Sequence, residues 1–268
     1  MSEERRAQVL ELIRQRGFAA LTDLAQELNV SESTIRRDLD FLEEAGGAQR
    51  THGGAFYTGP TPHLPHFRQR QYMQSEKKRQ VAAAAAALVE DGDVVLLDGG
   101  STTFELARLL VGRPVQVITN SLPVANLFTS SDGGDLILLG GYVHLRTGVT
   151  LGPYANEMLR SLNVRRAFIS VAGITERGYF NSNLLLVETE QAMQCAAEET
   201  IVLADSTKFG HQSLALLCEL GKIDHLVVDS GIGEDWRDRM KQAGVKLTIA
   251  ELPQGNNGDQ TTTIQKCD

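Results

Sequence analysis

Apolar residues near the N-terminus recur with the period of three short α-helices. The pattern predicts helices over residues 3–16, 23–28 and 32–44. Thr22 and Ser31 precede the second and third helices and are suited to cap them. In the third helix the apolar positions share one face, which leaves a polar face on the outside. That outer face carries Ser33, Arg37 and Asp40, with Arg36 on its flank.

Two helices joined by a short turn, the second with arginines on its outer face, are typical of a helix-turn-helix. In such motifs the second helix lies in the major groove of DNA. Arginine donates two hydrogen bonds to guanine, and hydroxyl groups reach phosphates or bases. Helical hairpins with solvated arginines also occur in proteins that bind no DNA, so the periodicity leaves both interpretations open.

Glycine pairs at 46–47 and 53–54 predict a short β-hairpin over residues 48–57. Beside a recognition helix such a hairpin would form a wing, with Arg50 and His52 near the DNA backbone or the minor groove. For His52 the alternative is a turn histidine that is bonded locally. The candidate DNA-binding residues are Thr22, Ser31, Ser33, Thr34, Arg36, Arg37, Asp40, Arg50 and His52.

The pattern changes after the hairpin. Residues 58–75 hold three of the seven prolines and no apolar period, which predicts a linker. An alanine-rich stretch over 77–88 predicts a helix, and continuous apolar runs follow that are typical of buried parallel strands. The runs lie at 94–97, 115–119, 136–139, 166–171, 200–203 and 226–228, with 246–250 as a candidate last strand.

Helical stretches separate several of these runs, which predicts a doubly wound α/β domain. We therefore expect four parts: a DNA-binding domain over 1–57, the linker over 58–75, the α/β domain over 76–253 and a disordered tail over 254–268.

Small and polar residues follow the predicted strands, which is where open α/β sheets bind their ligands. Residues 98–103, Asp-Gly-Gly-Ser-Thr-Thr, open a helix, and the free N–H groups of a helix N-terminus attract an anion such as phosphate. Lys208 is suited to pair with a phosphate charge, and Asp205 and Asn120 to bind sugar hydroxyls or to hold the loops.

Taken singly, such residues are more often helix caps, turns or solvated tips, so the prediction depends on their shared location. The candidate effector-binding residues are Asp98, Gly100, Ser101, Thr102, Thr103, Asn120, Ser121, Gly140, Gly141, Asp205 and Lys208.

The composition of the chain restricts which classes of protein and which modes of DNA binding are possible. The chain of 268 residues is 42% hydrophobic and 22% charged, which is typical of a globular protein of about two domains. Its net charge of −8 argues against indiscriminate nucleic-acid binding, so DNA binding must depend on local placement of basic residues. Three cysteines without a C-x-x-C motif predict neither a disulfide framework nor a zinc site, and we expect no cofactor. We find no apolar stretch long enough for a membrane span and no secretory signal, so the cytoplasm is the expected location.

Residues 5–56 resemble the N-terminal winged helix of the DeoR family of bacterial transcriptional regulators. The resemblance rests on Leu-Ala at 24–25, Val-Ser at 30–31, TIRRDLDFLEEAG at 34–46 and Arg50 followed by THGGA at 51–55. The blocks LDGGSTTFELA, ITNSL, LLGG and LADSTKFG resemble, in this order, the C-terminal sensor domain of the same family over residues 76 to about 230.

This resemblance implies a sensor fold akin to ribose-5-phosphate isomerase and coenzyme A transferases, and a phosphorylated sugar or related metabolite as the effector. It implies a phosphate loop and further pocket residues at Asp98, Ser101, Thr102, Thr103, Asn120, Ser121, Asp205 and Lys208. The chain departs from the family pattern at Ser170 and Ala172, where a glycine and a polar residue are usual.

We therefore predict a DNA-binding transcriptional regulator, a repressor of a carbohydrate-catabolic operon whose DNA binding a phosphorylated sugar controls. Its partners would be operator DNA, the effector and further copies of the chain, in a dimer or a higher even oligomer. The alternative is an enzyme, a sugar-phosphate isomerase or acyl transferase, which needs a positioned carboxylate base. The sequence argues against the enzyme, because it lacks a DGADE-like acidic turn and a Lys-Gly-Gly-Gly loop.

Overall fold

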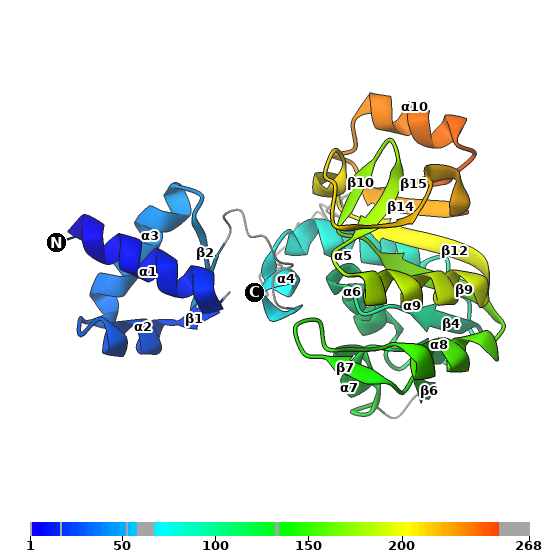
Figure 1. The fold of residues 1–268 in the computed structure, drawn as a ribbon, viewed down its shortest axis with the longest axis horizontal. Coiled ribbons are helices and arrows are strands. Elements are labelled where there is room, and N and C mark those ends of the chain that lie inside the picture. The colour runs from blue at the N-terminus through cyan, green and yellow to red at the C-terminus, as the bar shows by residue number, and fades with distance from the viewer. Residues whose placement is uncertain (1, 17, 52, 58–66, 132–133, 252–268) are drawn as a thin grey trace, which may run out of the picture.

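The computed structural model describes residues 2–16, 18–51, 53–57, 67–131 and 134–251 (Figure 1). Within these ranges, none of the helices combines the length and the apolar character needed to cross a bilayer. The expected tail over 254–268 and His52 lie outside the described residues.

The N-terminal elements form a small domain with a hydrophobic core of its own. Its helices are α1 (Ser2–Arg16), α2 (Leu21–Glu27) and α3 (Glu32–Glu44), close to the predicted bounds. Its strands β1 (Phe18–Ala20), β2 (Ala48–Thr51) and β3 (Gly54–Tyr57) form an antiparallel sheet in the order β1-β3-β2. The predicted hairpin is confirmed, whereas the pattern did not predict β1.

The cap assigned to Thr22 is wrong. Helix α2 begins at Leu21, so Thr22 lies inside its first turn, and Ala20 is the cap residue without a side-chain hydrogen bond. The chain enters α2 directly from β1, and this strand pairing, which is not local, sets the start of the helix. Ser31 does cap α3, because its side chain accepts from the Thr34 N–H at 3.3 Å.

A buried ion pair orients α3. Asp38 lies on the inner side of α3 and is 1% exposed. Arg5 and Arg6 of α1 donate to its two carboxylate oxygens, at 2.6 Å from Arg5 Nε and 3.3 Å from Arg6 Nε. Because a buried carboxylate needs such partners, this pair ties α1 to the back of α3 and turns the opposite face outward.

The linker prediction is wrong for its last part. Helix α4 (Phe67–Tyr72) lies within residues 58–75, and α5 (Ser75–Ala86) follows almost at once. Phe67 is buried against Phe104, with ring centroids 5.4 Å apart. A six-residue helix is too short to show a period, and α4 is stabilised by its packing on the α/β domain.

A seven-stranded parallel sheet forms the centre of the second domain. The strand order is β15-β14-β12-β9-β4-β5-β6, and every neighbouring pair is parallel. The strands are β4 (Val94–Leu97), β5 (Gln116–Thr119), β6 (Asp135–Leu138), β9 (Val164–Ser170), β12 (Ala197–Ala204), β14 (His225–Asp229) and β15 (Lys246–Ala250). Each corresponds to one of the seven predicted runs.

Helices cover both faces of the sheet, so the doubly wound prediction is confirmed. One core joins the sheet to α5, α6 (Ser101–Leu110) and α7 (Leu122–Phe128). The other core includes residues of α8 (Pro153–Arg160), α9 (Leu184–Cys195) and α10 (Glu234–Gln242). Apolar residues buried on both faces explain why the strands read as continuous hydrophobic runs.

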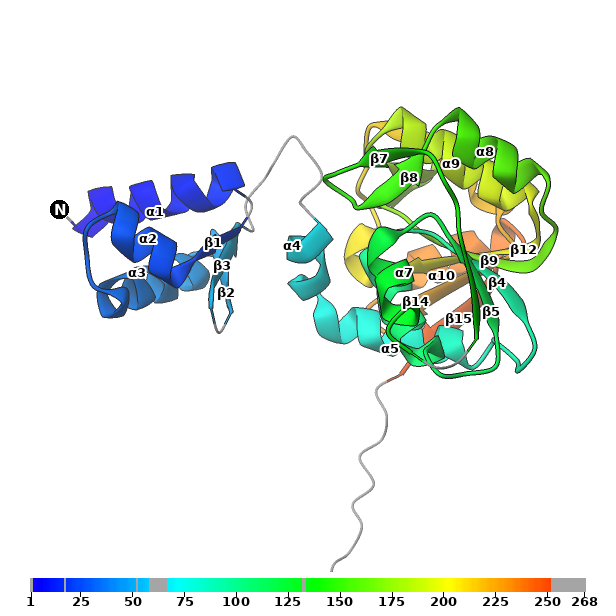
Figure 2. The same cartoon turned by 90° about the horizontal axis from the view of Figure 1, so that it is seen from below.

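Short strands that the pattern did not predict surround the sheet. They form the hairpin β7 (Tyr142–His144) and β8 (Val149–Leu151), and a small sheet of β10 (Gly173–Thr175), β11 (Gly178–Asn181) and β13 (Ala215–Cys218). Two 3-10 turns, η1 (Ser206–Lys208) and η2 (Leu220–Lys222), complete the elements. Figure 2 shows β7, β8, α8 and α9 side by side at one side of the sheet.

The strand order reverses between β4 and β9. The chain runs outward from β4 to β6 on one side and from β9 to β15 on the other. At such a switch point the connections after the two central strands leave in opposite directions and open a crevice at their carboxyl ends.

Candidate functional site

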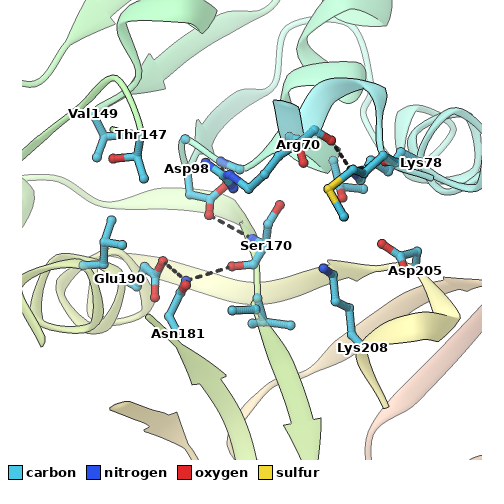
Figure 3. A pocket seen from close by; sticks show the side chains of 18 of the residues that line it. Arg70, Lys78, Asp98, Thr147, Val149, Ser170, Asn181, Glu190, Asp205 and Lys208 are labelled. Atoms are coloured by element: carbon cyan, nitrogen blue, oxygen red, sulfur yellow. Dashed lines mark hydrogen bonds between the residues drawn. The ribbon is translucent and has the colours of Figure 1, made fainter. Parts of the chain in front are cut away.

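A cavity of about 160 Å³ lies at this crevice (Figure 3). Seven of the residues predicted to bind an effector line it: Asp98, Gly100, Ser101, Thr102, Asn120, Asp205 and Lys208. They come from the ends of β4, β5 and β12, three strands that are distant in the sequence.

The Asp98 carboxylate fixes the conformation of the loop that follows β4 and lines the cavity. Its carboxylate accepts from the Gly100 N–H at 3.0 Å, from the Ser170 N–H at 2.9 Å and from the Thr103 hydroxyl. Burial raises the pKa of Asp98, and these donors and the Arg70 charge oppose that rise. With its oxygens engaged in this way, Asp98 shapes the loop and is poorly placed to act as a base.

The start of α6 forms the anion-attracting end of the cavity. Gly100 caps the helix without a side-chain hydrogen bond, and the N–H groups of Ser101 and Thr102 bond to none of the described residues. Adding a Cβ to Gly100 would bring it to 2.2 Å from the Ser170 side chain, so glycine is required there. Free N–H groups together with the helix dipole favour an anion at this point.

Three basic side chains lie around the same cavity: Arg70 of α4, Lys78 of α5 and Lys208 of η1. Burial lowers the pKa of Arg70 to about 10, so it stays charged at neutral pH. Burial, with a smaller effect of the Lys208 charge, lowers the pKa of Lys78 to about 7. Lys78 Nζ donates to the carbonyl oxygens of Arg70 and Met73, which ties α5 to α4.

Several polar atoms of the cavity have no partner. Among the described residues, five buried side-chain nitrogen or oxygen atoms lack a hydrogen bond, and four of them belong to cavity residues. These four are Arg70 Nε, Asn120 Oδ1, Asp205 Oδ2 and Glu190 Oε2. Unsatisfied buried polar groups are costly, and their concentration here indicates that a polar ligand completes the site.

Four predicted site residues do not line the cavity. Thr103 donates to the Asp98 carboxylate, and Ser121 caps α7 by accepting from the Val124 N–H at 3.3 Å. Gly140 faces Met158, and Gly141 has a φ of +146° beside the Leu151 carbonyl. The pattern shows which residues follow strands, but β6 is an outer strand far from the switch point, so the glycines after it serve a turn.

The outer face of α3 is as predicted. Ser33, Arg36, Arg37 and Asp40 are exposed on it. Arg36 lies 3.7 Å from Glu32, and Asp40 pairs with Arg50 of the wing, so their charges are partly compensated. Within the described part of the chain, Arg37 pairs with no carboxylate, and it is the arginine of this face that is best placed to reach a base.

The other candidate DNA contacts lie beside this face. Ser31 and Thr34 are at the start of α3, where their hydroxyls are 2.9 Å apart in the cap. Thr22 is exposed on α2.

Two comparisons bear on the family. Residues 5–61 match the DeoR-like helix-turn-helix domain, and residues 73–230 match the DeoR C terminal sensor domain. The chain belongs to the DeoR family. The predicted resemblance is confirmed, and the chain is a transcriptional regulator with the family's helix-turn-helix and sensor domains.

Similar DeoR-family relatives span nearly the whole chain. A protein of Escherichia coli O157:H7, whose name assigns it to repression of the aga operon, is 35% identical over 92% of this chain and 94% of its own. The HTH-type transcriptional regulator UlaR of E. coli K12 DH10B is 31% identical over 92% of this chain and 99% of its own.

Solved structures resemble parts of the fold. Ribose 5-phosphate isomerase A of Methanocaldococcus jannaschii is 23% identical, with a TM-score of 0.37 over 51% of this chain and 55% of that one. The eIF2B β protein of Chaetomium thermophilum is 14% identical, with a TM-score of 0.44 over 57% and 48%.

Sequence reasoning missed several residues of the DeoR sensor cavity. The missed polar ones are Arg70, Gln74, Lys78, Thr147, Ser170, Asn181, Glu190 and Thr207. Two of them carried a signal. Thr207 lies between Asp205 and Lys208 in the block LADSTKFG, and Ser170 is a departure from the family pattern that the structure explains. The Ser170 hydroxyl accepts from the Thr103 N–H at 3.3 Å, so Ser170 satisfies one of the N–H groups in the first turn of α6.

Proposed function

We propose that this regulator is a repressor of a carbohydrate-catabolic operon, and that a phosphorylated sugar in the sensor cavity controls its DNA binding. The observation that carries the proposal is the start of α6, where unbonded N–H groups face a cavity that also holds Arg70 and Lys208. The phosphate would lie there, and sugar hydroxyls would donate to Asn120 Oδ1 and Asp205 Oδ2. The names of the two relatives, a repressor and a transcriptional regulator, support the regulatory part.

On this proposal residues 1–57 bind operator DNA and the sensor begins at α4, at residue 67, rather than at residue 76. A single recognition helix reads only a few base pairs, so we expect a dimer or a higher even oligomer on two half-sites. A protein that reads chromosomal DNA would act in the cytoplasm. We assign no catalytic role to the cavity, because Asp98 is held by three donors.

Helix α4 is placed to couple the two functions. It follows residues 58–66 directly, and the Arg70 side chain reaches the cavity while Lys78 Nζ donates to the Arg70 carbonyl oxygen. An effector changes DNA affinity only if the domain arrangement that binds DNA has a different affinity for the effector from the arrangement that does not bind DNA. The coupling free energy between two such sites is typically about 1–3 kcal/mol. A bound phosphate that attracts the Arg70 side chain would favour one position of α4 over another.

A thermal-shift screen of the full chain tests this proposal. At about 100 times its dissociation constant, a specific ligand adds roughly 2.7 kcal/mol to the unfolding free energy. We expect stabilisation by one phosphorylated sugar and none by its unphosphorylated form, and the same sugar should change the affinity for DNA from upstream of the regulated operon. If neither phosphorylated sugars nor that DNA bind, the proposal is wrong.

The affinity for a phosphorylated sugar should depend on pH. A phosphate beside Lys78 favours its charged form, whereas in the free protein Lys78, with a pKa of about 7, loses its proton as the pH rises above 7. The second pKa of a phosphate ester is about 6, so the charge of the ligand stays nearly constant there. We expect affinity to fall by up to about tenfold per pH unit above pH 7.

Titration calorimetry at pH 6.5, 7.5 and 8.5 measures this dependence. Lys78→Met should bind more weakly and with a flat profile over the same range. A wild-type affinity that is constant from pH 6.5 to 8.5 would show that Lys78 does not exchange a proton on binding.

A further inference from the structure

Glu190 is a buried acid of the cavity that the phosphate end does not explain. It lies on α9, is 4% exposed and lines the cavity wall with Leu186, one helical turn earlier. Acidic side chains are rarely buried to this degree unless their oxygens are hydrogen-bonded or paired with a cation.

One oxygen of Glu190 is engaged and the other is not. Asn181 Nδ2 donates to Oε1 at 2.6 Å (Figure 3). The Asn181 amide is held in this orientation, because its Oδ1 accepts from the Ser182 N–H at 3.0 Å. Asn181 therefore determines which Glu190 oxygen is used, and Oε2 is left without a donor among the described residues.

The groups around Glu190 do not supply that donor. Burial, together with the charge of Asp98, raises the pKa of Glu190 well above its usual range, against the effects of Asn181 and Arg70. The Arg70 charge acts on Glu190, yet among the described residues the Arg70 side chain forms no ion pair or hydrogen bond with Glu190, and its Nε is itself unpartnered. A ligand between the two would meet an unused donor on one side and an unused acceptor on the other.

We propose that Glu190 determines effector specificity, with Oε2 accepting a hydrogen bond from the end of the effector that lies away from its phosphate. This inference rests on the proposed function, since it takes the start of α6 as the phosphate site. The matching chemistry is a cationic amine on the carbon skeleton, because a positive charge beside Oε2 opposes the effect of burial on the pKa of Glu190 and favours the carboxylate that can accept. A ligand without such a donor leaves Oε2 unsatisfied and is rejected, because a site built for a hydrogen bond discriminates against analogues that cannot form it.

The substitution Glu190→Gln tests this role with little change of shape. Asn181 Nδ2 continues to require an oxygen opposite it, so the new amide turns its NH2 group toward the cavity. The acceptor at the Oε2 position thereby becomes a donor. Glu188→Gln is the matched control, since Glu188 is exposed on the same helix and does not line the cavity.

The experiment titrates the full-length wild type and both variants with inorganic phosphate and with a panel of hexose, pentose and amino-sugar phosphates. We expect the strongest wild-type ligand of the panel to lose at least about tenfold in affinity for Glu190→Gln, with inorganic phosphate unaffected and Glu188→Gln equal to wild type. Within the panel, glucosamine 6-phosphate and glucose 6-phosphate differ by an amine in place of a hydroxyl, so the wild type should prefer glucosamine 6-phosphate and Glu190→Gln should lose that preference.

Unchanged sugar-phosphate affinity in Glu190→Gln, with inorganic phosphate still bound, would overturn the role of Glu190 and leave the proposed function standing. If the wild type binds neither inorganic phosphate nor any sugar phosphate, the proposed function fails and this inference fails with it.

Discussion

Replacing Arg70 with alanine is expected to raise the concentration of phosphorylated sugar needed to change DNA binding by about 10- to 150-fold. Hydrogen bonds that involve a charged group contribute about 1.5–3 kcal/mol, and Arg70 brings an unpartnered nitrogen to the cavity. DNA affinity without effector should stay as in the wild type, because Arg70 lies in the sensor. Fluorescence anisotropy of labelled operator DNA, titrated with the sugar phosphate, measures both quantities.

Arg68→Ala is the matched control for this prediction. Arg68 lies on the same short helix, is exposed and does not line the cavity, so its loss removes the same charge from α4 without removing a cavity group. We expect it to respond to the effector at the wild-type concentration. Equal responses of Arg70→Ala and wild type would refute the assignment of Arg70 to the effector.

Replacing Arg37 with alanine is expected to weaken operator binding by about 1–3 kcal/mol and to relax the preference at one base position. Arg37 is exposed on α3 and pairs with no carboxylate among the described residues, whereas Arg36 and Arg50 each have an acidic neighbour. Binding to a set of operators that differ by single base pairs measures the effect.

The control for Arg37 is Arg14→Ala, which removes one positive charge from α1, where Arg14 pairs with Glu11 at 2.7 Å. A phosphate contact would lower affinity for all sequences alike, whereas a base contact lowers it most for one base. If Arg37→Ala binds every operator as tightly as the wild type does, Arg37 does not contact the DNA.

The helices of the DNA-binding domain were predictable because their signals are local. The inward residues of α3 recur every three or four positions, and Ser31 caps the helix through a residue three places away. The error at Thr22 has the opposite origin, because α2 begins where β1 ends, and β1 exists only through its pairing with β3. Residues 18–20 alone carry no local pattern that predicts this pairing.

The cavity was predictable at its glycine and hydroxyl loops and not elsewhere. Residues 98–103 join the end of a strand to the start of a helix through two glycines. Because these signals lie within six positions, the sequence alone predicts an anion-binding loop there. Arg70 and Glu190 lie on helices whose local patterns resemble those of any solvated or amphipathic segment. They become cavity residues only because α4 and α9 pack at the carboxyl ends of β4 and β9.

By itself the amino-acid sequence determined the family, the two-part organisation, the seven parallel strands and the anion-attracting loop, because each depends on residues that are close together along the chain. The tertiary structure alone decided which of the many polar side chains share one cavity. It excluded Thr103, Ser121, Gly140 and Gly141 from the cavity lining, and it brought in Arg70, Lys78 and Glu190. The physical reason is that a site is defined by distances across the fold and by the loss of water around buried groups, and neither quantity is a property of a short stretch of sequence.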